Sequence, residues 1–186
     1  MFVTFGRLNR HLNREQMKNI SFRNDVLPLK NVLYRLALRI TLNKEEAEDI
    51  VQDTLIKVWN RRDSLQNVDS IEAFSLTICR NLSLDRQRKA GNDNQPIGDE
   101  EMSSADTASD PYERMIQKDR VELVKRIVDS LPEKQRSCMQ LRDFEGKSYK
   151  EIATVLGLSE EQVKVNIFRA RQAVKQKYKE YEGYGL

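Results

Sequence analysis

The sequence predicts an all-α protein that contains two small helical domains. Apolar residues recur at helical spacing along most of the chain. No segment shows the strict alternation of a β-strand. One stretch, residues 91–110, is rich in Asn, Asp, Gly and Ser and has almost no large apolar residue. We therefore expect an N-terminal basic arm, a first helical domain, a flexible acidic linker, a second helical domain and a short tail, at residues 1–21, 22–90, 91–111, 112–180 and 181–186.

Composition excludes several functional classes. Charged residues make up 33% of the 186 residues and hydrophobic ones 39%, which is typical of a soluble helical protein. No apolar run approaches the roughly 20 residues that span a bilayer, so we expect a cytoplasmic protein with no membrane insertion of its own. With a single histidine, His11, and two distant cysteines, Cys79 and Cys138, a zinc site is not expected. We predict buried thiols and no cofactor.

Charge is distributed unevenly around the net value of +3. Residues 91–117 contain seven acidic side chains and one basic one, whereas the blocks on either side are mildly basic. The N-terminal arm carries Arg7, Arg10 and Arg14 but no apolar central run, so it is not a secretory signal. A transit peptide, or a dispensable arm before a natural start at Met17, both remain open.

The first domain begins with two amphipathic helices. Pro28 suits the first turn of a helix that ends near Thr41. Its expected apolar stripe consists of Leu29, Val32, Leu33, Leu36, Ala37 and Ile40. Asn43, with Glu46 three residues later, is a capping box for the second helix. The expected buried stripe of that helix consists of Ala47, Ile50, Val51, Thr54, Leu55 and Val58.

The outer face of the second helix combines acids with an apolar residue. The residues on this face are Asp49, Gln52, Asp53 and Ile56. An exposed isoleucine among acidic side chains indicates an interface, and a solvated acidic face is the alternative.

A third helix follows the polar connection at residues 63–69. We expect Ile71, Phe74, Ile78 and Leu82 on its inward side. Another side carries Thr77, Arg80, Asn81, Leu84 and Arg88, close to the charged run from Asp85 to Lys89. An ordinary amphipathic helix with a basic C-terminus is the alternative to a binding surface.

The second domain begins after the linker. Pro111 precedes a helical run whose apolar residues are Tyr112, Met115, Ile116, Val121, Val124, Ile127 and Val128. Pro132 ends that run and starts a helix with Cys138, Leu141 and Phe144 on its inward side.

The stretch from Ser148 to Lys177 predicts a helix-turn-helix. Gly157 permits the left-handed conformation that ends the first helix. Capping pairs begin both helices, Ser148 with Glu151 and Ser159 with Gln162. The two apolar stripes consist of Tyr149, Ile152, Ala153 and Leu156, then Val163, Ile167, Ala170 and Val174.

The second of these helices predicts DNA binding. Its stretch from Lys164 to Lys179 contains six basic residues and no acidic one. Such a helix suits the major groove, where Val165 and Phe168, which lie off the core stripe, would touch thymine methyl groups. A solvated basic helix with Phe168 packed on a neighbour is the alternative.

Three segments together resemble the extracytoplasmic-function (ECF) type of bacterial sigma factors, in the sigma-70 family. Residues 47–63, AEDIVQDTLIKVWNRRD, resemble the polymerase-binding helix of region 2. Residues 78–89, ICRNLSLDRQRK, resemble the promoter-melting helix that follows it. Residues 131–175 resemble region 4. The resemblance covers residues 26–90 and 112–180.

The resemblance implies three sets of binding residues. Asp49, Gln52, Asp53 and Ile56 would bind core RNA polymerase. Arg80, Asn81, Leu84, Asp85 and Arg88 would recognise and melt the minus-ten promoter element. Lys164, Val165, Phe168 and Arg169 would read the minus-thirty-five element, while Arg171 and Lys175 would contact phosphates. It also implies a separate anti-sigma factor as a partner.

Three other functions explain the sequence less well than a sigma factor does. A stand-alone helix-turn-helix regulator would need a ligand-binding or dimerisation domain, and the first block offers no convincing one. An enzyme is not expected, because Glu45, Glu46, Glu48, Asp49 and Asp53 spread around their helix with no histidine nearby. An adaptor or anti-sigma role would leave the basic helix unexplained.

Overall fold

A computed structural model describes residues 20–89 and 111–183 of the chain. All regular elements within these residues are helical, which confirms the all-α prediction. Residues 1–19 of the predicted arm, most of the predicted acidic linker and the last three residues of the tail lie outside the described residues.

The N-terminal half is a bundle of three long helices with short helical turns around it. A π-helical turn, η1 (Phe22–Val26), and a 3-10 turn, η2 (Leu27–Leu29), lead into α2 (Lys30–Thr41). Helix α3 (Lys44–Asn60), the 3-10 turn η3 (Arg62–Asn67) and α4 (Ile71–Lys89) follow. Asn43 begins α3 as predicted, since its side chain accepts a hydrogen bond from the backbone of Glu46 at 3.1 Å. Ile20 is already buried in this bundle.

The predicted stripes of α2 and α3 are confirmed, whereas the stripe predicted for α4 is rotated. All six residues predicted inside α3 are buried, and so are the five predicted residues that lie in α2. The sixth residue of the first predicted stripe, Leu29, belongs to η2 and is partly buried. In α4 the buried residues are Ser75, Leu76, Cys79 and Ser83. Ile71, Phe74, Ile78 and Leu82, which were predicted to point inward, are only partly buried. Small residues at steps of four let the α4 backbone approach α2 closely, and a count of large apolar residues misses such a face.

The C-terminal half consists of α5 (Pro111–Asp129), α6 (Glu133–Met139), the π-helical turn η4 (Gln140–Phe144), α7 (Tyr149–Leu156) and α8 (Glu160–Gly183). One prediction for this half was wrong. Phe144 is 55% exposed, because the π turn inserts a residue and rotates it away from the core. Val121 of α5, one of the apolar residues of that helical run, is exposed.

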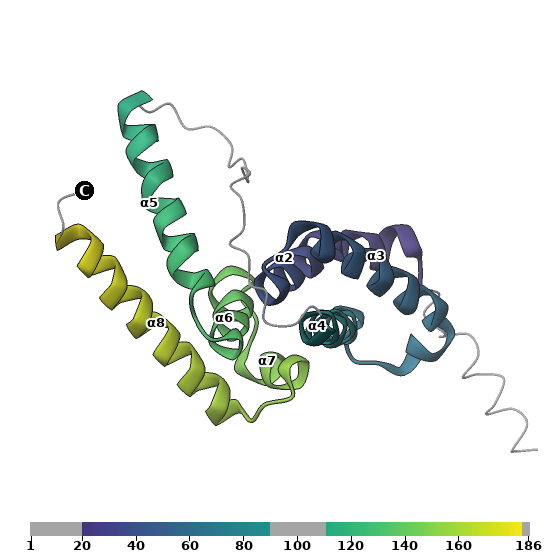
Figure 1. Cartoon of the computed structure of the whole chain (residues 1–186). Helices are drawn as coiled ribbons and strands as arrows, with labels where there is room; N and C mark the ends of the chain where they lie inside the picture. Colours follow the sequence, from purple (N-terminus) through teal and green to yellow (C-terminus); the bar gives the residue numbers. More distant parts are fainter. Residues whose placement is uncertain (1–19, 90–110, 184–186) are drawn as a thin grey trace, which may run out of the picture.

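The two halves share a continuous hydrophobic core. Buried residues of α2, α3 and α4 form one cluster with Cys138, Leu141, Ile152 and Val155 of the second half. Helix α4 packs against α7, and α2 packs against α6. Figure 1 shows α5 and α8 as two arms that diverge away from this junction. The described parts of the two predicted domains are therefore packed together.

Both cysteines are free and fully buried, as predicted. Burial raises the pKa of the Cys79 thiol to about 12, although hydrogen bonds with Thr54 and Ser83 act in the opposite direction. Burial also raises the pKa of Cys138 to about 12, and the charge of Glu133 adds to this effect. The thiolate is the reactive form of cysteine, so both side chains are protected in the folded protein.

We expect neither thiol to react with an aromatic disulfide reagent at pH 8 while the protein is folded. In urea both cysteines should react at once, because unfolding restores their ordinary pKa and exposes them. The measurement is the absorbance of released thiolate against time, with the urea-unfolded protein as the control. Rapid release from the native protein would contradict the buried placement.

Candidate nucleic-acid and polymerase interfaces

The helix-turn-helix is built as predicted, from α7 and α8. The Ser148 hydroxyl accepts from the backbone N–H of Glu151 at 3.2 Å, and a Glu151 carboxylate oxygen accepts from the backbone N–H of Ser148 at 2.8 Å. The Ser148 hydroxyl and backbone N–H also hold the pKa of Glu151 below its ordinary value. Ser159 and Gln162 make the same reciprocal pair at the start of α8, at 3.2 and 2.9 Å. Both helix starts are thus fixed by local sequence.

Gly157 ends α7 with φ +62°, in the left-handed region. A Cβ atom at this position would meet nothing within 4 Å. Glycine is therefore required by the backbone conformation and not by space. The turn it makes sets the angle at which α8 leaves α7.

Helix α8 presents an exposed face that is both basic and apolar. Val163, Ile167 and Ala170 are buried, as predicted for its inner stripe. On the other side Val165 is 45% exposed and Phe168 63% exposed. Lys164, Arg169, Arg171 and Lys175 are exposed around them. The alternative, in which Phe168 packs on a neighbour, is not what the structure shows.

Two of the basic residues predicted to contact DNA from α8 have partners within the described part of the chain. The Lys164 ammonium lies 5.7 Å from the centre of the Tyr149 ring, across the turn. The Arg171 guanidinium forms an ion pair with Asp143 of η4, and this hydrogen bond raises the pKa of Arg171. Arg171 therefore ties α8 to η4. Arg169 and Lys175 extend from the same helix with exposed side chains.

The predicted minus-ten residues lie on the C-terminal half of α4. Asn81, Asp85 and Arg88 are exposed. Leu84 is partly buried against the hydrophobic core, so only part of its side chain is accessible. The Arg80 guanidinium donates to the side-chain amide oxygen of Asn81 at 3.1 Å, while its buried Nε has no acceptor in the described part of the chain.

The predicted polymerase-binding residues form one exposed face on α3. Asp49, Gln52 and Asp53 are exposed, and Ile56 is 57% exposed. Asp53 lies 3.8 Å from Arg86 of α4, so this face borders the helix that carries the minus-ten residues.

An aromatic cluster next to this face was missed by the sequence analysis. The rings of Phe22 and Trp59 meet edge to face with centroids 5.4 Å apart, and Arg62 lies 4.7 Å above the Trp59 ring. Phe22 is exposed. The available signal was the position of Trp59, three residues after Ile56, which places both residues on one side of α3.

The described residues contain no group of three or more His, Cys, Asp or Glu side chains that could hold a metal ion. None of the described helices has the length and apolar character of a membrane span.

The family model described as "Sigma-70 region 2" matches residues 26–92, and the model "Sigma-70, region 4" matches residues 122–174. The ECF RNA polymerase sigma factor SigL of Mycobacterium tuberculosis is 32% identical over 145 residues, which cover 77% of this chain and 81% of that protein. The chain belongs to the ECF sigma factors of the sigma-70 family. It is a promoter-directing RNA polymerase sigma factor, as the resemblance predicted.

Other relatives and solved structures agree with this assignment. The RNA polymerase sigma-H factor of Pseudomonas aeruginosa is 30% identical over 160 residues, or 80% of this sigma factor and 81% of that one. The sigma factor RpoE of Bartonella quintana, solved with the anti-sigma factor NepR, superimposes with a TM-score of 0.68 at 26% identity and covers 85% of this chain and 96% of that one. CnrH, solved with the cytosolic domain of CnrY, has the same fold, with a TM-score of 0.60 at 22% identity, 90% of this chain and 94% of that one.

We expect Gly157→Ala to destabilise the sigma factor by about 1–2 kcal/mol, the cost of a left-handed conformation for a residue with a Cβ atom. The urea midpoint followed by circular dichroism measures this loss. Lys150→Ala, an exposed substitution on α7, serves as the control and should change stability by less than about 0.5 kcal/mol. Equal midpoints for Gly157→Ala and the control would contradict the role assigned to this turn.

Proposed function

We propose that this sigma factor divides its binding work among three helices. The outer face of α3 binds core RNA polymerase, α8 reads the duplex minus-thirty-five element, and the C-terminal half of α4 holds the melted minus-ten strand. The observation that carries the proposal is the face of α8. Val165 and Phe168 are exposed between basic side chains, on a helix whose other side is buried and whose start is capped. An α-helix of this kind fits the major groove of duplex DNA.

The role of α3 follows from its charge. Asp49 and Asp53 would be repelled by phosphates, so this face suits a protein surface better than DNA. Ile56 supplies an exposed apolar centre, and the neighbouring Phe22–Trp59 pair extends the apolar area. Interfaces commonly place apolar and aromatic residues inside a polar rim.

The role of α4 follows from the uncharged middle of its outer side, where Asn81 and Leu84 stand in place of a dense basic stripe. Asn81 is exposed, whereas the Arg88 guanidinium forms an ion pair with the Asp85 carboxylate, 3.4 Å away. A surface of this kind grips duplex phosphates weakly but can hydrogen-bond to unstacked bases. Binding that favours the melted strand over the duplex shifts the equilibrium toward melting.

Further properties accompany this role. The solved relative RpoE is bound to an anti-sigma factor, and we propose that a separate anti-sigma factor also regulates this chain. The protein acts in the cytoplasm, where core polymerase and DNA are found, and it catalyses no reaction of its own.

In vitro transcription with purified core polymerase and a promoter library tests the proposal as a whole. We expect specific initiation only when both the sigma factor and the core enzyme are present. Specific operator binding by the chain alone, with no effect of core polymerase, would instead identify a stand-alone regulator.

We expect Asp49→Lys to weaken binding to core polymerase by about tenfold, because it reverses a charge at the centre of the α3 face. Fluorescence anisotropy of the labelled sigma factor titrated with core enzyme measures the affinity. Glu48→Lys is the matched control, since it makes the same charge change on α3 about 100° around the helix. An Asp49→Lys protein that binds no worse than the control would remove the assignment.

We expect Asn81→Ala to reduce open-complex formation by more than about fivefold, with closed binding almost unchanged. Arg169→Ala should have the opposite effect and weaken closed binding at promoters that depend on the minus-thirty-five element. Permanganate footprinting measures melting, and a gel-shift assay of the holoenzyme measures closed binding. Normal melting by the Asn81→Ala protein would refute the division of work between α4 and α8.

A further inference from the structure

A two-pronged ion pair joins α8 to the turn that precedes the helix-turn-helix. Nε of Arg171 donates to one carboxylate oxygen of Asp143 at 3.2 Å, and Nη2 donates to the other oxygen. The Asp143 side chain is only 23% exposed, although it lies at the surface of the fold. A guanidinium and a carboxylate that share two hydrogen bonds have a fixed planar geometry. The pair therefore restricts rotation and sliding of α8 more than a single contact would.

The π-helical turn η4 holds the backbone around Asp143 in place. The backbone N–H of Glu145 donates to the carbonyl oxygen of Gln140 at 3.1 Å, and that of Lys147 donates to the carbonyl oxygen of Leu141 at 2.9 Å. Leu141 itself is fully buried. Turns of this type are rare and are frequent at functional sites. The Asp143 carboxylate is thus presented to α8 from a turn whose backbone is fixed.

Lys164 and Arg171 lie on the same edge of α8, because seven residues make about two helical turns. The Lys164 ammonium lies 5.7 Å from the centre of the Tyr149 ring, and the Arg142 guanidinium lies 4.7 Å from the same centre. An ammonium beside a ring keeps its three N–H donors, so Lys164 stays available to DNA. Arg171 differs, since two of its donors are on a carboxylate. Any phosphate beside Arg171 would also meet the negative charge of Asp143.

We propose that Asp143 makes Arg171 a positioning residue for minus-thirty-five recognition, and that this ion pair adds no phosphate contact of its own. The pair fixes the orientation in which Val165 and Phe168 are exposed to the DNA. It also leaves α8 with fewer free charges, so a smaller share of the binding energy is independent of sequence. Asp143 thereby raises the ratio of specific to non-specific affinity. The inference rests on the proposed reading of duplex DNA by α8, and it replaces the phosphate contact that the family resemblance implies for Arg171.

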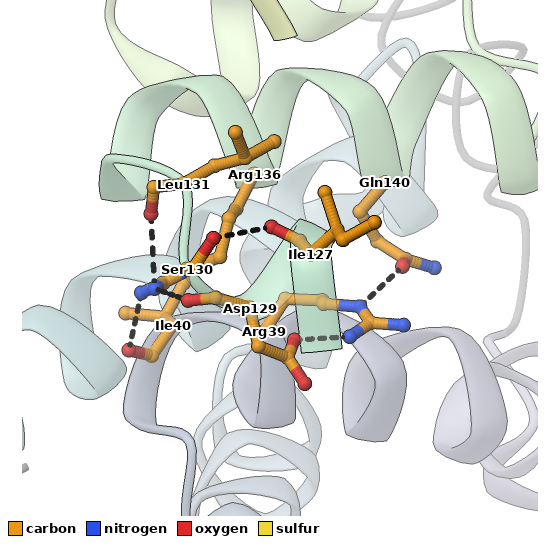
Figure 2. Close-up of polar contacts among 8 residues, drawn as sticks. All are labelled: Arg39, Ile40, Ile127, Asp129, Ser130, Leu131, Arg136 and Gln140. Carbon is orange, nitrogen blue, oxygen red and sulfur yellow. Dashed lines mark hydrogen bonds and ion pairs between the residues drawn. The ribbon is translucent and has the colours of Figure 1, made fainter. Parts of the chain in front are cut away.

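A separate contact holds the far end of α8. The Lys177 ammonium donates to the Ser130 hydroxyl oxygen at 2.7 Å, and that hydroxyl donates to the carbonyl oxygen of Ile127 at 2.7 Å (Figure 2). Val163 and Ile167 are buried on the inner side of the same helix. These contacts keep α8 docked when the ion pair of Asp143 is removed, so variants at this position can be tested in a folded protein.

The salt dependence of DNA binding tests the proposal with holoenzyme made from the full-length sigma factor and core polymerase. Each phosphate contact contributes about −0.9 to the slope of log affinity against log salt concentration. Fluorescence anisotropy of a labelled duplex that carries the minus-thirty-five element gives the affinity at several salt concentrations. A duplex with a scrambled element gives the non-specific affinity, and circular dichroism checks that each variant keeps its helices.

We expect Asp143→Asn to steepen the slope by about 0.9, because the released Arg171 gains a phosphate contact. Its ratio of specific to non-specific affinity should fall by about threefold. The double variant Asp143→Asn/Arg171→Gln removes both charges of the pair. Its slope should return to the wild-type value, whereas its specificity ratio should stay low because α8 has lost the contact that orients it.

Two matched controls calibrate these changes. Lys175→Gln removes an exposed cation of the same helix and gives the slope expected for the loss of one phosphate contact. Glu160→Gln removes an acidic charge from the exposed first turn of α8 and should leave the slope almost unchanged. A double variant with a slope as shallow as that of Lys175→Gln, or equal slopes for Asp143→Asn and Glu160→Gln, would overturn the proposal. Wild-type holoenzyme that binds both duplexes equally would instead refute the proposed function of α8, and the positioning role with it.

Discussion

The arrangement of the two halves depends on a buried guanidinium. Arg136 is 5% exposed, and its Nη1 donates to the carbonyl oxygens of Asp129 and Leu131 at 2.7 and 3.1 Å. These carbonyls lie at the end of α5 and in the turn after it, where helical hydrogen bonds stop. Burial lowers the pKa of Arg136, against the charges of Asp129 and Glu133, which raise it. A cation beside the carbonyls at a helix C-terminus interacts favourably with the helix dipole. The other terminal nitrogen of Arg136, Nη2, points toward the carbonyl oxygen of Ile40 at the end of α2 (Figure 2). One side chain therefore caps the end of α5 from α6 and reaches from α6 toward α2.

Local sequence was sufficient to predict most of the helices and the helix-turn-helix. Ser148, Gly157 and Ser159 act through bonds and dihedral angles within a few residues, so their effect is visible without a fold. The same is true of the exposed residues on α3 and α8, whose helical spacing places them opposite a strongly apolar stripe. Predictions failed where a tertiary contact or an irregular turn decided the outcome. Cys79 and Ser83 are buried because α4 lies close to α2, which no periodicity in large apolar residues reveals.

The polar contacts between the halves were not predictable for a related reason. Arg35 and Glu145 are 110 positions apart, and each alone has the ordinary appearance of a solvated charge. Burial alone would raise the pKa of Glu145, but hydrogen bonds from Arg35 and Gln140, with the charges of Arg35 and Lys147, lower it overall. The stability that this carboxylate contributes to the folded protein is fully present above its ordinary pKa of 4.5. That stability is lost as the pH falls through the lowered pKa of the folded state. The outer faces of α3 and α8 remain exposed in this arrangement, so both surfaces are accessible while the two halves are packed together.

The π-helical turn at Gln140–Phe144 has a consequence for how homologous chains should be aligned. A π turn accommodates one residue more than an α-helical turn, and in a regular α-helix that extra residue would rotate everything after it by about 100°. A relative with a continuous α-helix here needs one residue fewer between its equivalents of Cys138 and Ser148 to bring the same side of α7 to the core. An alignment without a gap in this short segment would pair buried positions of one chain with exposed positions of the other.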